Sequence, residues 1–382
     1  MIREFTPDRA EKTSKNKPLL SFVRSENRVN SIWQYLKRYE DPTFVNKRLR
    51  ADYPSIGTIL RKKKAQHVAD CIRQAEAYFE TARTSDLSIK PLIIYYGMLD
   101  LVKALMLFGD NQLTLDDDTL KNEGLNSHGL THGTRCPNDV SIRDNVNNLL
   151  NEFCYISFGR NTNTVYSLLH ECWSTNKPTN STKVVLGDLL SAHPSTWRSY
   201  AEHTSKMPRY FKATDSFRTT ANGYEHFIGF EGTFRFDTYG YTPIPGNSNL
   251  FFTQQMPRLA SSYTNDTVYG PYGYASKRIP TSLEEYQPVY RATTGGSYTM
   301  ADPIPNMPLH PIEIEFLAMF ILGSLARYAP QKWLKNVQYG GGGEMFVVEG
   351  IINSATVSFP KMILEELDNR TYTFTGDSSY WG

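Results

Sequence analysis

The sequence predicts an α+β protein, mainly an α-helical bundle that carries a β-rich, aromatic-rich insertion. Apolar residues recur at spacings of three and four from Lys64 to Ala82, as they do on one face of a helix. The segment from Pro91 to Phe108 is apolar nearly all round, which is typical of a buried central helix. Between Tyr210 and Tyr298 the composition changes, and Tyr and Phe supply 19 of these 89 residues.

The first third of the chain predicts short helices followed by two long ones. Amphipathic patterns between Ser31 and Leu49 indicate short helices with a break near Pro42, because proline disrupts a helix interior. The long helix from Lys64 continues directly from the basic run at 61–64. The next one opens at Lys90-Pro91, since proline is favoured in a first helical turn. Residues 1–18 lack periodicity and are expected to form a frayed arm.

The rest of the chain alternates between helical and irregular patterns. Helices are expected at Ile142–Phe153, Lys183–Ala192, Pro311–Tyr328 and Glu344–Asp368, and Gly232–Tyr239 alternates with the period of a half-buried strand. The expected domains are a basic N-terminal arm with short helices (1–63), a helical core (64–208), a β- and loop-rich insertion (209–305), C-terminal helices that return to the core (306–370) and a tail (371–382). The tail is expected to be disordered from Thr373 to Gly382.

Composition narrows the class of protein. At 382 residues with 40% hydrophobic content, the chain can bury a large core. No stretch approaches the roughly 18 to 20 apolar residues of a membrane span, and no apolar segment follows the charged N-terminus, so we expect a cytoplasmic protein. The four cysteines show neither paired nor zinc-ligand spacing, and we expect no metal and no cofactor. They are Cys71, Cys136, Cys154 and Cys172.

Charge is distributed unevenly along the chain. Residues 1–64 hold 16 Lys and Arg against 7 Asp and Glu, a net of +9, so that with +2 overall the other 318 residues carry −7. Such a basic segment is a candidate site for the phosphates of RNA or DNA, with Arg61, Lys62, Lys63 and Lys64 as the expected contacts. The alternative is a solvated helical surface with a flexible arm.

Two groups of motifs, one near each end, carry a family resemblance. The first is RQAEAYF at 73–79, followed by KPLIIYYGMLDLVKAL at 90–105 and HGL at 128–130. The second is LARYAPQKW at 325–333, followed by FPKMILEEL at 359–367. Together they resemble the YaaC-like family, which implies a bacterial intracellular protein but no specific activity.

A second, looser resemblance is to HEPN-type helical domains, which also place a Tyr-Tyr pair ahead of a basic residue and Ala-Leu on one helix, then a His-Gly loop. Many HEPN proteins are ribonucleases that use an Arg-x(4–6)-His motif, and others bind partners or nucleotides. Two stretches fit that motif, Arg61 to His67 and Arg198 to His203. Composition alone predicts a similar number of matches by chance.

Two further groups of residues are candidate sites. His128, His132 and Arg135 form a cluster that could handle a phosphoryl or other anionic ligand, or His128 could simply cap the loop. Buried charges need partners, so those within apolar helices predict either an interior ion-pair network or an anion-binding pocket lined by aromatic rings. The residues of this second group are Arg73, Tyr95, Tyr96, Lys103 and Arg327.

Three functional hypotheses follow. The leading one is a component of a bacterial stress or antiviral defence system, acting through contacts with another protein of the same operon, with a homo-oligomer as a further option. The second is a metal-independent HEPN-like ribonuclease, with His128, Arg135, Arg198 and His203 as candidate catalytic residues. The third is a nucleotide or small-anion sensor. An enzyme is not favoured, because no convincing catalytic constellation is evident.

Overall fold

The computed structural model gives the protein a mainly α-helical fold with a smaller β component, which confirms the predicted fold class. Contacts divide the chain into two compact units, residues 1–187 with 310–382, and residues 188–309. The predicted domain boundaries stay a prediction. The structure describes residues 19–25, 27–109, 113–116, 127–133, 148–157, 164–172, 181–206, 210–220, 223–231, 268–269, 274–279, 289–291, 297–300, 309–339 and 343–375.

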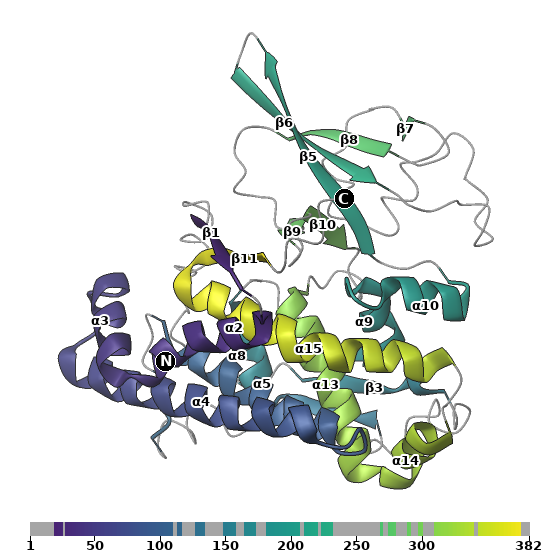
Figure 1. Cartoon of the computed structure of the whole chain (residues 1–382), viewed down its shortest axis with the longest axis horizontal. Coiled ribbons are helices and arrows are strands. Elements are labelled where there is room, and N and C mark those ends of the chain that lie inside the picture. Colours follow the sequence, from purple (N-terminus) through teal and green to yellow (C-terminus); the bar gives the residue numbers. More distant parts are fainter. Residues whose placement is uncertain are drawn as a thin grey trace. The chain divides into compact units, whose positions relative to one another are not determined.

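The first unit is built on four long helices (Figure 1). They are α4 (Thr58–Thr84), α5 (Lys90–Leu107), α13 (Pro311–Tyr328) and α15 (Gly343–Asp368). Because α5 and α13 are apolar nearly all round, both are buried over most of their surface. α5 packs against α4, α13 and α15, so the prediction that the segment beginning at Pro91 packs on the C-terminal helices is confirmed.

Short N-terminal helices lie against this frame. α2 (Arg28–Leu36) leads into a 3₁₀ turn, η1 (Lys37–Glu40), and then into α3 (Pro42–Asp52). The predicted break near Pro42 is confirmed, and it has a local cause. The Asp41 carboxylate accepts the backbone N–H of Thr43 as an N-cap, while Pro42 opens the new helix where no backbone donor is needed.

A three-stranded antiparallel sheet in the order β2-β3-β4 corrects two predicted helices. Its strands are β2 (Leu130–His132), β3 (Phe153–Ile156) and β4 (Thr182–Val185). Of the helix predicted at 142–153, the described part is the turn η3 (Leu149–Asn151) and the start of β3. The helix predicted from Lys183 begins only at Leu186, after β4, as α9 (Leu186–Ala192). Short apolar runs rich in β-branched and aromatic residues are compatible with either a helix or a strand, and here pairing with neighbouring strands determines which one forms.

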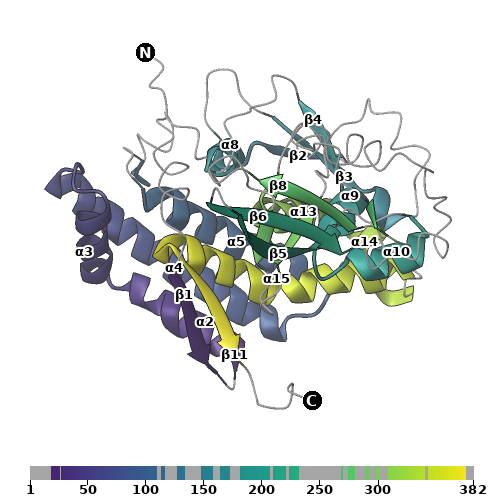
Figure 2. The ribbon, with the colours of Figure 1, turned by 90° about the horizontal axis from the view of Figure 1, so that it is seen from above.

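The chain ends of the first unit meet in a parallel pair of strands. β1 (Leu19–Arg24) pairs with β11 (Arg370–Thr375) over six residues, and Figure 2 shows the two strands side by side, next to α15. The sequence instead predicts a disordered tail from Thr373, so residues 373–375 are a correction. Strand pairing supplies the order that the local sequence does not indicate. The described part of the unit also contains α8 (Val165–Glu171) and α14 (Pro330–Tyr339).

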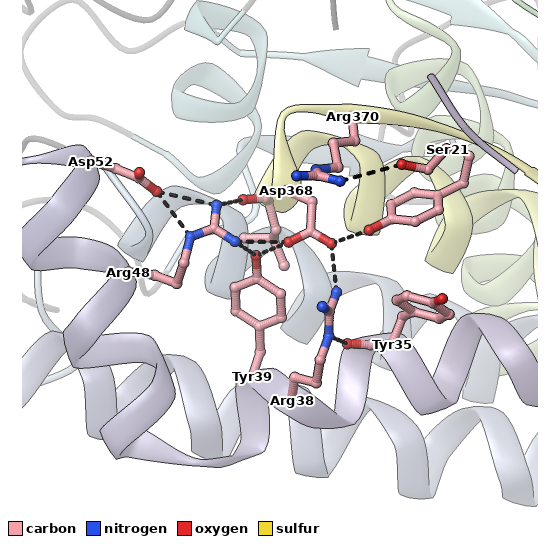
Figure 3. Close-up of polar contacts among 10 residues, drawn as sticks. Ser21, Tyr35, Arg38, Tyr39, Arg48, Asp52, Asp368 and Arg370 are labelled. Carbon is pink, nitrogen blue, oxygen red and sulfur yellow. Dashed lines mark hydrogen bonds and ion pairs between the residues drawn. The ribbon is translucent and has the colours of Figure 1, made fainter. Parts of the chain in front are cut away.

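A polar cluster around Asp368 joins the N-terminal helices to the end of α15 (Figure 3). Its carboxylate accepts hydrogen bonds from the Tyr39 and Tyr372 hydroxyls at 2.7 and 2.6 Å. It also forms ion pairs with Arg38 and Arg48 at 2.7 and 2.9 Å. The carboxylate is almost fully buried, and residues more than 300 positions apart in sequence therefore share one acceptor.

The second unit combines α10 (Trp197–Thr204) with a six-stranded sheet in the order β7-β8-β6-β5-β10-β9. All pairs within this sheet are antiparallel. The strand predicted at 232–239 lies outside the described residues. The six strands are β5 (Tyr210–Thr220), β6 (Gly223–Glu231), β7 (Val268–Tyr269), β8 (Tyr274–Ile279), β9 (Val289–Arg291) and β10 (Ser297–Met300).

None of the helices in the described part of the chain is long and apolar enough to cross a bilayer.

Candidate functional site

A pocket of about 90 Å³ lies in the first unit, where α5, β2 and α13 come together. Gly323 allows this approach, because a β-carbon there would lie 3.2 Å from the Cα atom of Leu92. The pocket lining combines aromatic rings with a few polar groups, as small-ligand sites do. It consists of Leu92, Tyr95, Tyr96, His128, Leu130, Thr131, His132, Phe320, Gly323, Ser324, Arg327 and Tyr328.

The His-Gly loop places one imidazole of this pocket. The Tyr95 hydroxyl lies 2.7 Å from His128 Nδ1. The loop is fixed to the start of α8, because the Tyr166 N–H donates to the His128 carbonyl at 3.2 Å. Gly129 has a φ of +73°, in the left-handed region, and a β-carbon there would lie 2.1 Å from Thr164 Oγ1. Glycine at this position therefore lets His128 reach Tyr95.

Two cationic side chains, Lys103 and Arg327, act on His128 through their charges. Arg327, in the last turn of α13, forms no ion pair with a carboxylate of any described residue. Its Nη1 donates to the Tyr96 hydroxyl at 2.7 Å. Lys103 pairs with Asp100 at 3.1 Å. Burial lowers the pKa of His128, and the charges of Lys103 and Arg327 lower it further. A neutral imidazole therefore lies beside an arginine that has no counter-ion in the described part of the chain.

A second imidazole, that of His132, lines the pocket and lies near the Glu152 carboxylate. His132 Nε2 lies 3.7 Å from a Glu152 carboxylate oxygen, and Lys332 donates to the other oxygen of the same carboxylate. Burial, and then the charge of Lys332, lowers the pKa of His132 to about 4. His132 is 1% exposed, so it is an uncharged wall of the pocket at neutral pH.

Five predicted site residues meet in this pocket. Tyr95, Tyr96 and Arg327 come from the predicted anion-binding group, and His128 and His132 come from the loop cluster. Lys103 does not line the pocket but acts on His128 through its charge. Arg135 lies outside the described residues. Sequence reasoning missed Tyr328, Ser324 and Thr131 as site residues. Tyr328 lies in the motif at 325–333, and the other two could have been indicated only by their proximity to Arg327 or His132 along the chain.

Arg73 is a correction. Its side chain is 55% exposed and pairs with Asp70 on the same helix at 3.0 Å, rather than lying inside the bundle. Its other terminal nitrogen donates to the Glu40 carbonyl at 3.3 Å. Arg73 and Arg327 are both exposed, but Arg73 has an acidic partner, whereas Arg327 forms no ion pair among the described residues.

The basic run at the start of α4 does not form one surface. Lys62 and Lys63 are exposed, and Lys63 pairs with Asp116 at 3.1 Å. Arg61 donates to the Asn46 side chain at 3.0 Å and to the Ile56 carbonyl at 3.1 Å. Lys64 is fully buried, with Nζ 3.4 Å from the Leu113 carbonyl. The expected nucleic-acid contact at Lys64 is thus placed in the interior, and the others stay a prediction.

The two Arg/His motifs each lie on a single helix. His67, on α4 with Arg61, accepts the backbone N–H of Leu115 at 3.0 Å. Arg198 and His203 are exposed side chains of α10 in the second unit, and the Arg198 guanidinium lies 5.5 Å from the Trp197 ring. Their catalytic roles stay a prediction. Within the described ranges, no group of three or more His, Cys, Asp and Glu side chains is placed to hold a metal ion.

Replacing Gly129 with alanine should lower the free energy of unfolding by about 1–3 kcal/mol, because the new methyl group meets Thr164 and the backbone is strained. Gly57→Ala is the matched control, since nothing lies within 4 Å of its added β-carbon, and it should change stability by less than about 1 kcal/mol. Urea unfolding of the full chain measures both. Equal effects would show that the His-Gly loop tolerates a side chain.

The fold and pocket together define a helical protein with a small cavity, lined by aromatic rings and a few polar groups, between its central helices. The profile of the YaaC-like Protein family matches residues 34–367, which is most of the chain. The protein therefore belongs to the YaaC-like family, and the resemblance seen in the sequence is confirmed. No curated protein and no solved structure matches it.

Proposed function

We propose that the protein binds a small oxyanion, of the chemical type of phosphate, in the pocket between α5, β2 and α13. The observation that carries this proposal is the convergence of Arg327, His128 and the Tyr96 hydroxyl on one cavity. Arg327 has no acidic partner among the described residues, so an anion would meet a guanidinium that no carboxylate neutralises. A planar guanidinium suits oxyanions because it can donate two parallel hydrogen bonds.

His128 adds a response to the charge of the ligand. Its pKa is lowered by burial and by the charges of Lys103 and Arg327. A bound anion opposes all of these effects, since a negative charge nearby favours the protonated imidazole. His128 would thus be neutral in the empty site and would gain a proton as the anion enters. Tyr95, which lies against Nδ1, holds the ring in place.

This proposal is better supported than the ribonuclease hypothesis. Anion binding rests on residues that share a cavity, whereas Arg61 and His67 hold separate partners. A ligand-binding pocket also suits a sensor within a larger assembly. Incubation with total RNA separates the two hypotheses. Cleavage that disappears in His128→Ala or His203→Ala would favour the enzyme.

Calorimetric titration of the full chain with inorganic phosphate tests the proposal. Arg327→Met should weaken binding about 10- to 100-fold, because a hydrogen bond to a charged group contributes roughly 1.5–3 kcal/mol. Arg73→Met is the matched control, an exposed arginine that already has an acidic partner, and it should leave the affinity within about twofold. The proposal fails if phosphate does not bind, or if both variants bind it equally.

A further inference from the structure

The pocket is too small to enclose a drug-sized ligand. Pockets for drug-sized ligands occupy about 300–1,000 Å³, whereas this one has a volume of about 90 Å³. It can hold an oxyanion but not a large organic molecule. Any larger part of the ligand would therefore lie over the rim, where the exposed groups decide what it contacts.

The rim carries an exposed aromatic ring. Tyr328 is 44% exposed and lines the pocket directly beside Arg327, whose Cζ atom lies 5.1 Å from its ring centroid. The ring and the guanidinium belong to neighbouring residues in the last turn of α13. A ligand that touches Arg327 with an anionic group is therefore within reach of the Tyr328 ring.

The other tyrosines of the pocket are already packed. Tyr95 is 5% exposed and contacts the rings of Tyr96, Phe316 and Phe320 at centroid distances of 5.8, 5.4 and 5.5 Å. The Tyr96 ring stacks on Tyr78 at 5.9 Å. These rings build the wall, whereas Tyr328, whose ring contacts the Arg327 guanidinium, is 44% exposed. Hydrophobic Leu92 lies on the same pocket and extends the apolar part of the lining.

We propose that the ligand is a nucleoside monophosphate, with its phosphate at Arg327 and His128 and its base stacked on Tyr328. This inference rests on the proposed oxyanion site and specifies what the anion is attached to. Every nucleobase has a π-face, so stacking on one tyrosine gives affinity without selecting the base. A phosphorylated sugar without a base would fill the pocket but leave Tyr328 uncovered.

Calorimetric titrations of the full chain with AMP, ribose 5-phosphate, inorganic phosphate and adenosine test this. AMP should bind at least about fivefold more tightly than ribose 5-phosphate, the lower end of what base stacking contributes. Tyr328→Ala should abolish that difference and leave the affinity for inorganic phosphate unchanged. Tyr328→Phe keeps the ring and should preserve the difference. Because Tyr328 is partly exposed, all variants should unfold at the same temperature as the parent protein.

The outcomes separate this inference from the oxyanion site itself. If phosphate, ribose 5-phosphate and AMP bind equally, or if the preference for AMP survives Tyr328→Ala, the base-stacking inference is wrong and the oxyanion site stands. If adenosine binds as well as AMP while phosphate does not bind, the oxyanion site is wrong. If none of the four binds, both are overturned.

Discussion

Replacing Asp368 with asparagine should lower the free energy of unfolding by about 3–5 kcal/mol, the effect typical of breaking a buried ion pair. The carboxylate is 3% exposed, and its two oxygens serve Arg38, Arg48, Tyr39 and Tyr372. An amide keeps the size of the side chain but removes its charge. It also turns one acceptor into a donor facing groups that are themselves donors.

The pKa shifts in this cluster agree with that expectation. Burial alone would raise the pKa of Asp368, but the hydrogen bonds from Tyr372 and Tyr39 and the charge of Arg38 outweigh it, so the pKa lies below its usual value. Burial and the neighbouring carboxylate raise the pKa of Tyr372 to about 12. The folded state thus favours a charged Asp368 and neutral tyrosines. The contribution of the Asp368 charge to the free energy of unfolding is fully present above the normal aspartate pKa, and it is lost as the pH falls through the lowered pKa of the folded state.

Asp52→Asn is the matched control, because Asp52 also pairs with Arg48, at 3.2 Å, but is 38% exposed. An exposed pair of this kind contributes about 1 kcal/mol or less. Urea unfolding followed by circular dichroism gives both values, and hydrogen exchange over β1 and β11 shows whether the strand pair loosens in Asp368→Asn. If the two variants are equally stable, the cluster does not hold the chain ends together.

Sequence patterns find the central helices because their signal is local. α5 and α13 are apolar on nearly every side, and each has a proline at its first or second residue. The sequence therefore shows both the burial of these helices and the position where each one begins. The pair of β1 and β11 is not visible in this way. Leu19 pairs with Arg370, and neither strand has a strong pattern of its own, so their order depends on a partner about 350 residues away.

The same distinction explains the candidate site. Tyr95, Tyr96 and Arg327 are recognisable as polar groups on apolar helices, and the structure brings them together because α5 packs on α13. The expected burial of Arg73 is wrong because its apolar neighbours are counted along the chain rather than around the helix. Ala69, Ile72 and Ala75 face the core, and a side chain next to Ile72 points about 100° away from it.

Replacing Glu313 with alanine should lower the free energy of unfolding by about 3–5 kcal/mol and also weaken phosphate binding. Glu313 is fully buried in the first turn of α13. One carboxylate oxygen accepts the Tyr166 hydroxyl at 3.0 Å and lies 2.7 Å from His170 Nδ1. The other accepts the backbone N–H of His310 at 2.8 Å, as part of a capping box. Truncation removes all three contacts at once and leaves a cavity.

The effect on binding follows from the route between Glu313 and His128. Through Tyr166 and His170, Glu313 fixes α8 to α13. The backbone N–H groups of Val165 and Tyr166 in turn hold the carbonyls of Ser127 and His128, at 3.0 and 3.2 Å. When α8 loosens, the loop that aims His128 at the pocket loosens with it, although Glu313 itself does not line the pocket.

Glu344→Ala is the matched control for Glu313→Ala. Glu344 is also in the first turn of a long helix, α15, and accepts the Leu149 N–H at 2.8 Å, but it is only partly buried. Its removal should lower the free energy of unfolding by about 1 kcal/mol and leave phosphate binding unchanged. Urea unfolding and phosphate titration are then compared across Glu313→Ala, Tyr166→Phe and Glu344→Ala. Because Tyr166→Phe removes only one of the three contacts, it should fall between the other two in both measurements. Unchanged phosphate affinity in a folded Glu313→Ala variant would mean that His128 is positioned by Tyr95 alone.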